Sequence, residues 1–206
     1  MRIDAEISRE IALSKMGTRD LNSTGAKAFN IGSMYTNATL SRVLMDESKV
    51  PVLNNWMKEK NKILLIQGSP GTGKTYISAA VLNYYYDERL EAFYTNHRRF
   101  ISKIQEGFSK DHTQDYSVNQ FAYKDILVFD DLGAATNTDW QQEVILDLID
   151  KRVSMQKKTL FTTNLTNAEL YETFGSRTAS RLLAKDNFKI EMWTGDMRQE
   201  NIDVGF

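Results

Sequence analysis

The chain of 206 residues contains no cysteine, only two prolines and only two histidines. The absence of cysteine excludes disulfide bonds and thiolate metal sites, and His97 and His112 are too isolated to indicate a metal site. No apolar run approaches the roughly 20 residues that a membrane-spanning helix needs. The charged N-terminus, MRIDAEISRE, also lacks the apolar core of a signal peptide. We therefore expect a cytoplasmic protein without a membrane partner.

A strong charge of one sign is missing as well. The net charge is −1 at pH 7, so no global field draws the protein to nucleic acid, and any such contact needs a local basic patch. The remaining composition, 41% hydrophobic and 26% charged, is ordinary for a soluble globular protein. A chain of this length accommodates one domain with a substantial core and a small appendage.

The strongest local signal is a glycine-rich stretch that follows an apolar run at residues 63–66. Residues 68–75 read GSPGTGKT and fit the pattern G-x-x-x-x-G-K-[ST]. In that pattern inward-facing backbone N–H groups form an anion nest, and the start of the next helix adds its positive dipole end. A glycine-rich turn that binds nothing is the alternative, but apolar residues at helical spacing over residues 75–86 complete the strand–loop–helix context.

This stretch therefore predicts an ATP or ADP site with Mg²⁺. We expect Lys74 to reach the β- and γ-phosphates and the Thr75 hydroxyl to ligate the metal ion. The predicted nucleotide-binding residues are Gly68, Ser69, Pro70, Gly71, Thr72, Gly73, Lys74, Thr75 and Tyr76.

Two further apolar runs end in polar side chains. Residues 126–133, ILVFDDLG, end in two carboxylates, of which we assign Asp130 to the Mg²⁺ water shell (the Walker B role) and Asp131 to the attacking water. A strand that exits into an acidic turn is the alternative. Residues 160–165, LFTTNL, place Asn164 where its amide could position water or sense the γ-phosphate, although ordinary turn chemistry explains these residues equally well.

Basic residues occur in two places of interest. Arg177 and Arg181 lie four residues apart and therefore share one face of a helix. Either this face is simply solvated, or one of the two arginines contacts the nucleotide of a neighbouring subunit. Arg98, Arg99 and Lys103 lie near Phe100, with three tyrosines at 84–86 upstream. They form a candidate surface for single-stranded DNA, unless the aromatic rings belong to the core.

Apolar periodicity alternates between strand and helix along the chain, which predicts a parallel sheet with helices on both sides. A polar stretch at 17–33 reads as a linker, and Thr166 or Asn167 is the expected cap of a short helix. The expected strands are 63–66, 92–95, 126–129, 159–163 and 188–193, and the expected helices are 2–16, 49–60, 75–86, 97–109 and 140–153.

Together these stretches resemble the AAA+ ATPases of the bacterial helicase-loader group, DnaC and DnaI, with the related transposition helper IstB. The resemblance covers about residues 35–198. Beside the phosphate loop, which all P-loop proteins share, it rests on the more specific combination of NATL (37–40), FDDLG (129–133), TTNL (162–165), SRL (180–182) and GDMR (195–198).

The resemblance implies an α/β P-loop NTPase of AAA+ (ASCE) type, with a parallel five-stranded sheet in the order 5-1-4-3-2 and a reduced or absent lid. Residues 1–36 would form a short N-terminal helix and linker, and residues 37–206 the ATPase domain. Asn164 would match sensor 1, and Arg181 the arginine finger that acts in trans across a head-to-tail assembly. The implied task is to bind a DnaB-type replicative helicase and help place it on single-stranded DNA.

Three departures from the family pattern qualify these expectations. Asp131 stands where typical AAA+ proteins carry glutamate, which predicts slow, partner-stimulated hydrolysis. Too few residues follow Arg181 for a full helical lid, which leaves Arg198 as a candidate for sensor 2. The region before the ATPase domain is shorter than in the family's loaders, so the helix at 2–16 is the only candidate for docking on a helicase. The alternatives are an IstB-like transposition helper, a non-hydrolysing adaptor that uses nucleotide as a ligand, and a small-molecule kinase, which the lack of an arginine-rich lid disfavours.

Overall fold

The computed structural model describes residues 28–87, 92–108, 113–134 and 138–193. The expected N-terminal helix at 2–16, the GDMR motif and Arg198 lie outside the described residues. Within the described part of the chain, no helix is long and apolar enough to cross a membrane.

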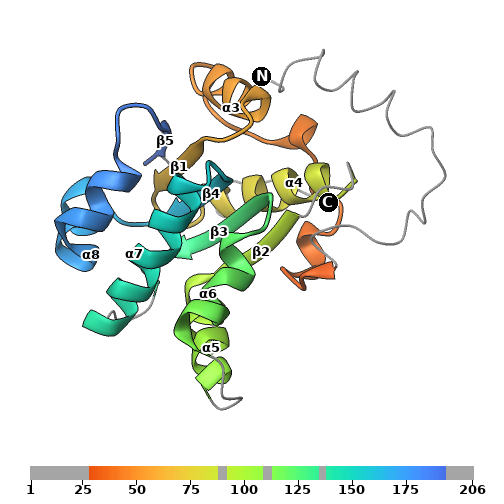
Figure 1. Ribbon diagram of the computed structural model, residues 1–206. Helices are drawn as coiled ribbons and strands as arrows, with labels where there is room; N and C mark the ends of the chain where they lie inside the picture. Colours follow the sequence, from red (N-terminus) through yellow and green to blue (C-terminus); the bar gives the residue numbers. More distant parts are fainter. Residues whose placement is uncertain (1–27, 88–91, 109–112, 135–137, 194–206) are drawn as a thin grey trace.

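A five-stranded sheet forms the centre of the molecule (Figure 1). Its order is β2-β3-β4-β1-β5, and every neighbouring pair is parallel, which confirms the predicted order and direction. The strands are β1 (Ile63–Gly68), β2 (Ala92–Asn96), β3 (Ile126–Leu132), β4 (Lys158–Thr163) and β5 (Phe188–Met192).

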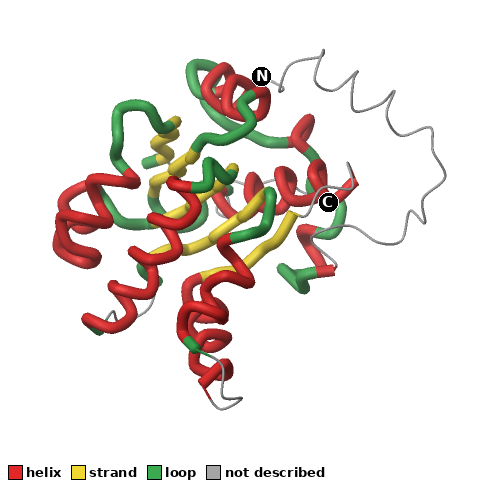
Figure 2. Tube along the Cα trace, viewed as in Figure 1, coloured by secondary structure: helices red, strands yellow, loops and turns green. Residues whose placement is uncertain are grey.

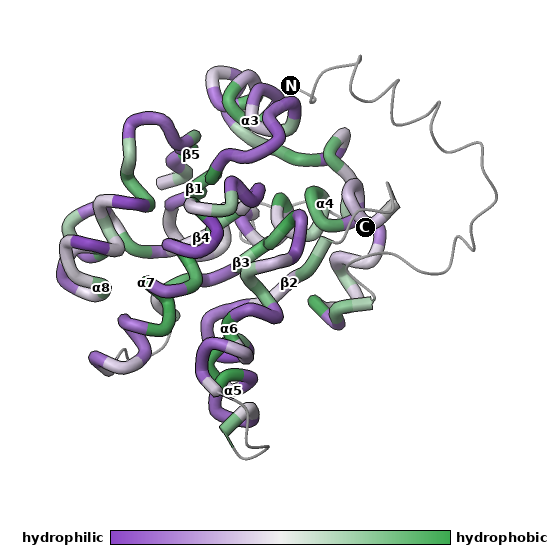
Figure 3. Tube along the Cα trace, in the orientation of Figure 1, coloured by the Kyte–Doolittle hydropathy of each residue, from purple (hydrophilic) through white to green (hydrophobic). Residues whose placement is uncertain are grey.

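The continuous apolar runs become central strands because both of their faces are covered. All six residues of β1 and of β4 are buried. Leu64 and Ile66 of β1 point into one core cluster, whereas Ile63 and Leu65 point into a second cluster on the other face. Apolar residues accordingly gather along β2, β3 and α4 in Figure 3.

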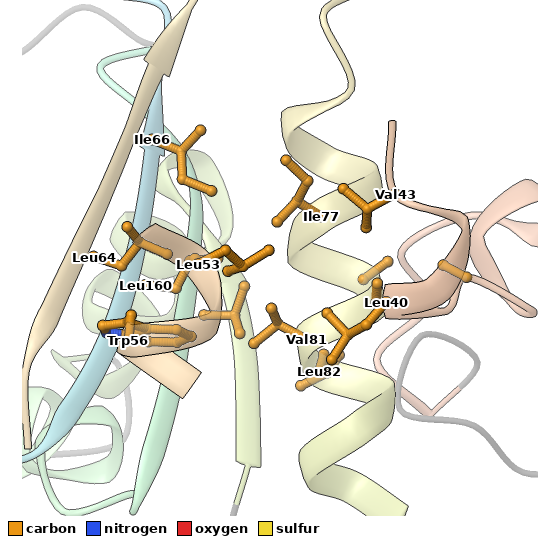
Figure 4. Packing of buried hydrophobic residues seen from close by; sticks show 14 of the residues in the cluster. Leu40, Val43, Leu53, Trp56, Leu64, Ile66, Ile77, Val81, Leu82 and Leu160 are labelled. Carbon is orange, nitrogen blue, oxygen red and sulfur yellow. The ribbon is translucent and has the colours of Figure 1, made fainter. Parts of the chain in front are cut away.

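The helices divide between the two faces according to these clusters (Figure 2). The first cluster holds η1 (Ser33–Tyr35), η2 (Leu40–Arg42), α3 (Val50–Lys58) and α4 (Lys74–Asp87). The second holds α5 (His97–Phe108), α6 (Gln114–Ala122), α7 (Asp139–Ser154) and α8 (Asn167–Leu182). In Figure 4, Leu64 and Ile66 face α4, with Leu40 and Val43 beside that helix.

Side-chain caps explain where two of these helices begin. Thr138 and Gln141 form a capping box on α7, and Thr166 and Glu169 form another on α8. Thr166 is therefore the N-cap, one of the two predicted candidates. The expected short helix is only the first segment of α8, because Gly175 (φ 73°, ψ 168°) interrupts the helical geometry before a second segment that carries Arg181.

Two buried cations fix helices at the amino end of β4. Arg152 of α7 donates to the Thr159 hydroxyl and to four backbone carbonyls. Lys158 donates to the last carbonyls of α3, including Trp56 O at 2.6 Å, and lies over the Trp56 ring. Burial lowers the pKa of Lys158 to about 8. Both helices are thus held firmly, and the opposite, carboxyl edge of the sheet carries the polar residues that the motifs single out.

Candidate active site

The loop after β1 is anchored on β5. A Cβ at Gly68 would lie 2.1 Å from Met192 O, so only glycine fits this close approach between strands. The Ser69 N–H donates to the same carbonyl at 3.1 Å. Gly71 (φ 85°) and Gly73 (φ 89°) then adopt left-handed backbone conformations that turn the loop into the start of α4.

The ammonium of Lys74 lies inside this loop. Lys74 is the first residue of α4 and is 7% exposed. Its Nζ donates to Gly68 O at 2.8 Å and to Ser69 O at 2.6 Å. The Thr72 hydroxyl also donates to Ser69 O, at 2.9 Å. A positive charge therefore coincides with the N-terminus of a helix, a combination that suits an anionic ligand such as a phosphate group.

The two residues after Lys74 differ in their surroundings. Thr75 lies in the first turn of α4, where a hydroxyl is well placed beside the loop. The Tyr76 hydroxyl instead accepts from the Thr39 N–H at 3.4 Å. Tyr76 thereby connects the start of α4 to the NATL segment at residues 37–40. A second hydrogen bond joins the same two elements, because the side-chain amide of Asn83 donates to Ala38 O at 2.9 Å.

Asp130 ends the buried part of β3 and is held by three hydroxyl groups from three different elements. Its Oδ1 accepts from Ser78 of α4 at 3.0 Å and from Thr162 of β4 at 2.5 Å, and its Oδ2 accepts from Tyr94 of β2 at 3.1 Å. Burial, and next the charge of Asp130, raise the pKa of Tyr94, so its hydroxyl remains a donor. Asp130 is 3% exposed, and its carboxylate is fixed in orientation beside the helix that carries Thr75.

Asp131 lies next to Asp130 but points to different partners. Its N–H donates to the Thr162 hydroxyl at 2.8 Å, and its Oδ1 accepts from the Asn164 amide at 3.1 Å. Burial, and next the charge of Asp130, raise its pKa, whereas Lys74 and Arg98 act in the opposite direction. The structure therefore brings together Asp130, Asp131 and Asn164, three residues that the sequence singles out on two strands.

Arg181 is engaged within its own chain. It forms an ion pair with Asp150 of α7, and its Nη1 donates to Arg177 O at 3.1 Å. Among the residues that the structure describes, no hydrogen bond or ion pair joins Arg177 or Arg181 to the phosphate loop.

The aromatic rings of the candidate surface for single-stranded DNA do not lie together with its basic residues. Tyr84 and Tyr85 belong to α4 and pack with the cluster on one face of the sheet, whereas α5 packs on the other. Phe100 is 0% exposed and contacts the rings of Phe121 and Phe129, so it belongs to the core. Phe100 and Tyr85 therefore belong to the core, the alternative that the sequence left open, whereas the role of the exposed residues Arg98, Arg99 and Lys103 stays a prediction.

Four residues that contact the carboxylates or their turn were not assigned a role from the sequence: Ser78, Tyr94, His97 and Thr162. Two of them, Tyr94 and Thr162, could have been placed beside Asp130 from the alternation of side chains between the two faces of a strand. Tyr94 and Thr162 lie on the face of the sheet that faces α4, the same face as Asp130. Ser78 lies one helical turn after Thr75.

Comparison with known proteins gives consistent matches. The sequence matches the family described as IstB-like ATP binding protein over residues 33–185. It is 28% identical over 136 residues to the replicative helicase loader DnaI of Bacillus subtilis (strain 168), covering 65% of this chain and 43% of that protein. It is 25% identical over 119 residues to the replicative helicase loader DnaC of Escherichia coli (strain K12), covering 57% and 49%.

A solved structure confirms the fold class. The crystal structure of the DnaC helicase loader superposes with a TM-score of 0.67 at 23% sequence identity, covering 78% of this chain and 99% of that one. At this identity the likeness concerns the fold alone. The matched region spans about half the length of the curated relatives, 43% of DnaI and 49% of DnaC.

Proposed function

Since the chain belongs to the family of IstB-like ATP binding proteins, we propose that it is an ATP-driven switch protein that acts on a DnaB-type replicative helicase. The observation that carries the proposal is the meeting of Lys74, Asp130, Asp131 and Asn164 at the carboxyl edge of one sheet. Residues 37–206 form the ATPase domain in this proposal, and residues 1–36 precede it.

The residues present fit a magnesium-bound nucleotide. Asp130 is a buried carboxylate whose orientation is fixed by hydroxyl donors, and one of them, Ser78, lies one turn beyond Thr75 on α4. Thr75 and Asp130 would hold Mg²⁺, and residues 68–76 would hold the phosphates and the adjoining part of the nucleotide. When bound, the metal ion neutralises charge on the β- and γ-phosphates.

Hydrolysis is assigned to residues on β3 and β4. Asp131 orients the attacking water and accepts its proton, and its raised pKa makes it a better base than an ordinary aspartate. Asn164 donates to the same carboxylate and keeps it directed toward the nucleotide. Lys74 stabilises charge on the transferred phosphoryl group, and Arg181 of a neighbouring copy completes the site in a head-to-tail assembly.

The helicase partner is proposed from the relatives, which are named replicative helicase loaders. A pull-down with the replicative helicase of the host is the direct test. We expect wild-type protein to retain the helicase in an ATP-dependent manner, because a switch protein binds its partner differently in its two nucleotide states. Lys74→Ala protein should show the same low retention with and without ATP.

A helicase that is not retained under either condition would contradict the proposed partner. Retention of a transposase in the same assay would instead support the IstB-like alternative, which the family match also accommodates. Adding single-stranded DNA to the assay tests whether it joins the complex.

Nucleotide binding itself is tested by titration calorimetry of Lys74→Ala. Removing one partner of a buried charge contact costs about 2–5 kcal/mol, so we expect the affinity for ATP to fall roughly 30- to 4,000-fold. Lys62→Ala is the matched control, because Lys62 forms an exposed ion pair with Asp186 at the other end of β1. Equal affinities of wild type and Lys74→Ala would remove the loop from the proposal.

A further inference from the structure

His97 is a buried residue at the junction between β2 and α5, and none of the roles proposed above involves it. Its side chain is 1% exposed and lies between two aromatic rings, with ring centroids 6.5 Å from Phe129 and 6.2 Å from Phe174. A histidine in such a position has a defined set of hydrogen-bond options, because each ring nitrogen is a donor or an acceptor but not both.

The hydrogen bond of His97 fixes its tautomer. The backbone N–H of Gly133 donates to His97 Nδ1 at 3.0 Å, so Nδ1 carries a lone pair and the proton of the neutral ring lies on Nε2. Nε2 is buried and has no hydrogen-bond partner among the described residues. Burial, assisted by the charge of Arg98, lowers the pKa of His97 to about 4, so the ring is neutral at physiological pH.

Gly133 belongs to the turn that carries Asp131. Asp131 has φ 56° and Gly133 has φ 90°, and the Ala134 N–H closes the turn on Asp131 O at 3.2 Å. A non-glycine residue in the left-handed region is strained, and such strain persists only where the surroundings enforce it. A Cβ at Gly133 would also lie 2.5 Å from Leu165 Cδ1, so the turn closely approaches the segment that follows β4.

The turn is held from both sides. On the β4 side, the Thr162 hydroxyl accepts from the Asp131 N–H at 2.8 Å, and the Thr163 hydroxyl donates to Leu132 O at 2.6 Å. On the β2 side, Gly133 donates to His97, and this is the hydrogen bond that the described residues show there. Without this acceptor the part-buried Gly133 N–H would lose its partner, and the strained turn would lose this restraint on the β2 side.

We propose that His97 is a positioning residue for Asp131, acting through its hydrogen bond to Gly133. The inference rests on the proposed role of Asp131 in hydrolysis. Its effect is on geometry, since a displacement of a catalytic group by about 1 Å can cost roughly 100-fold in rate.

The tautomer offers a test that needs no nucleotide. Imidazole nitrogen chemical shifts of ¹⁵N-labelled protein distinguish a protonated ring nitrogen from an unprotonated one. We expect His97 to be protonated on Nε2 and unprotonated on Nδ1. A protonated Nδ1 would overturn the proposal, because that nitrogen could not accept from Gly133.

The kinetic test uses two substitutions of matched design. His97→Phe keeps an aromatic ring between Phe129 and Phe174 but removes the acceptor, whereas His97→Asn loses the ring and places an amide oxygen near the position of Nδ1. We expect His97→Phe to lower kcat roughly 10- to 100-fold with the Kd for ATP within about threefold of wild type. His97→Asn should retain most of the activity while unfolding at a lower temperature. Equal losses in both variants would refute the positioning role.

A double-mutant cycle with Asp131→Asn separates this inference from the proposed function. If His97 acts through Asp131, adding His97→Phe to Asp131→Asn should lower kcat no further. Fully additive effects would show that His97 acts elsewhere. A normal kcat in Asp131→Asn alone would instead contradict the proposed function, whereas a slow Asp131→Asn beside a fast His97→Phe would contradict only the role of His97.

Discussion

Arg181→Ala is expected to bind ATP as tightly as wild type and to lose about 10³–10⁵-fold in assembly-stimulated kcat. The reason is that an arginine supplied to a neighbouring subunit's γ-phosphoryl group stabilises charge that develops only in the transition state. Phosphate release, measured at increasing protein concentration and in the presence of the partner helicase, gives the stimulated rate. Calorimetry on the same preparation gives the affinity.

Mixing variants tests whether the arginine acts in trans. A Lys74→Ala subunit has an intact Arg181, and an Arg181→Ala subunit has an intact phosphate loop, so mixed interfaces pair the two intact halves. We expect the mixture to regain part of the stimulated activity. A mixture that co-assembles but remains inactive would rule out action in trans, and the same loss in Arg177→Ala with a normal Arg181→Ala would move the role to Arg177.

The ion pair between Arg181 and Asp150 does not prevent this role. The two side chains are 34% and 35% exposed, and an ion pair at the surface contributes about 0–1 kcal/mol to stability. Arg181 can therefore exchange Asp150 for a phosphate group at small cost. The pair nevertheless holds the side chain on α8 in one place when no neighbouring subunit is bound.

Asp131→Asn is expected to retain ATP and to hydrolyse it at least about 100-fold more slowly, because an amide cannot accept the proton of the attacking water. Single-turnover hydrolysis with excess protein measures the chemical step, and calorimetry measures binding. Asp186→Asn, on an exposed carboxylate paired with Lys62, is the matched control and should behave as wild type.

The pH dependence of kcat follows from the direction of the pKa shift. Burial and the neighbouring Asp130 raise the pKa of Asp131, so the active, deprotonated form is lost at a higher pH than for an ordinary aspartate. We expect kcat to fall as the pH falls through this raised pKa, and this step should be absent in Asp131→Asn. Normal hydrolysis with weakened binding in Asp131→Asn would instead reverse the proposed roles of Asp130 and Asp131.

Much of the fold can be predicted from short apolar runs and from the turn residues that end them. The five strands and most helices agree with the expectation from apolar periodicity, and the strand order agrees with the order that the family resemblance implies. The clearest strand signal is that of β1, which is buried along its whole length and begins with a continuous apolar run. Helix α6 was not predicted. It is nine residues long, and its buried face includes Ser117 and Ala122 beside Val118 and Phe121, so its apolar periodicity is weak.

The candidate site also contains some residues that the sequence predicts and others that it does not. Asp130 and Asp131 lie in the last part of β3, Asn164 follows β4 directly, and Lys74 follows the loop after β1, so all four lie at the carboxyl edge. The hydroxyl groups around Asp130 and the imidazole of His97 could not be assigned, because their partners lie far along the chain and serine, threonine and tyrosine occur everywhere. His97 and Gly133, for example, are 36 residues apart in sequence.

The strand order also determines when this site can form during synthesis. β1 is the first strand to be made, yet its two neighbours in the sheet are β4 and β5, the last two. The hydrogen bond from the Gln67 amide to Leu165 O closes a loop of 98 residues, and such long-range closure is slow. The phosphate loop therefore emerges from the ribosome well before its supporting strands, and nucleotide cannot stabilise the nascent chain until nearly all of the sheet has been translated.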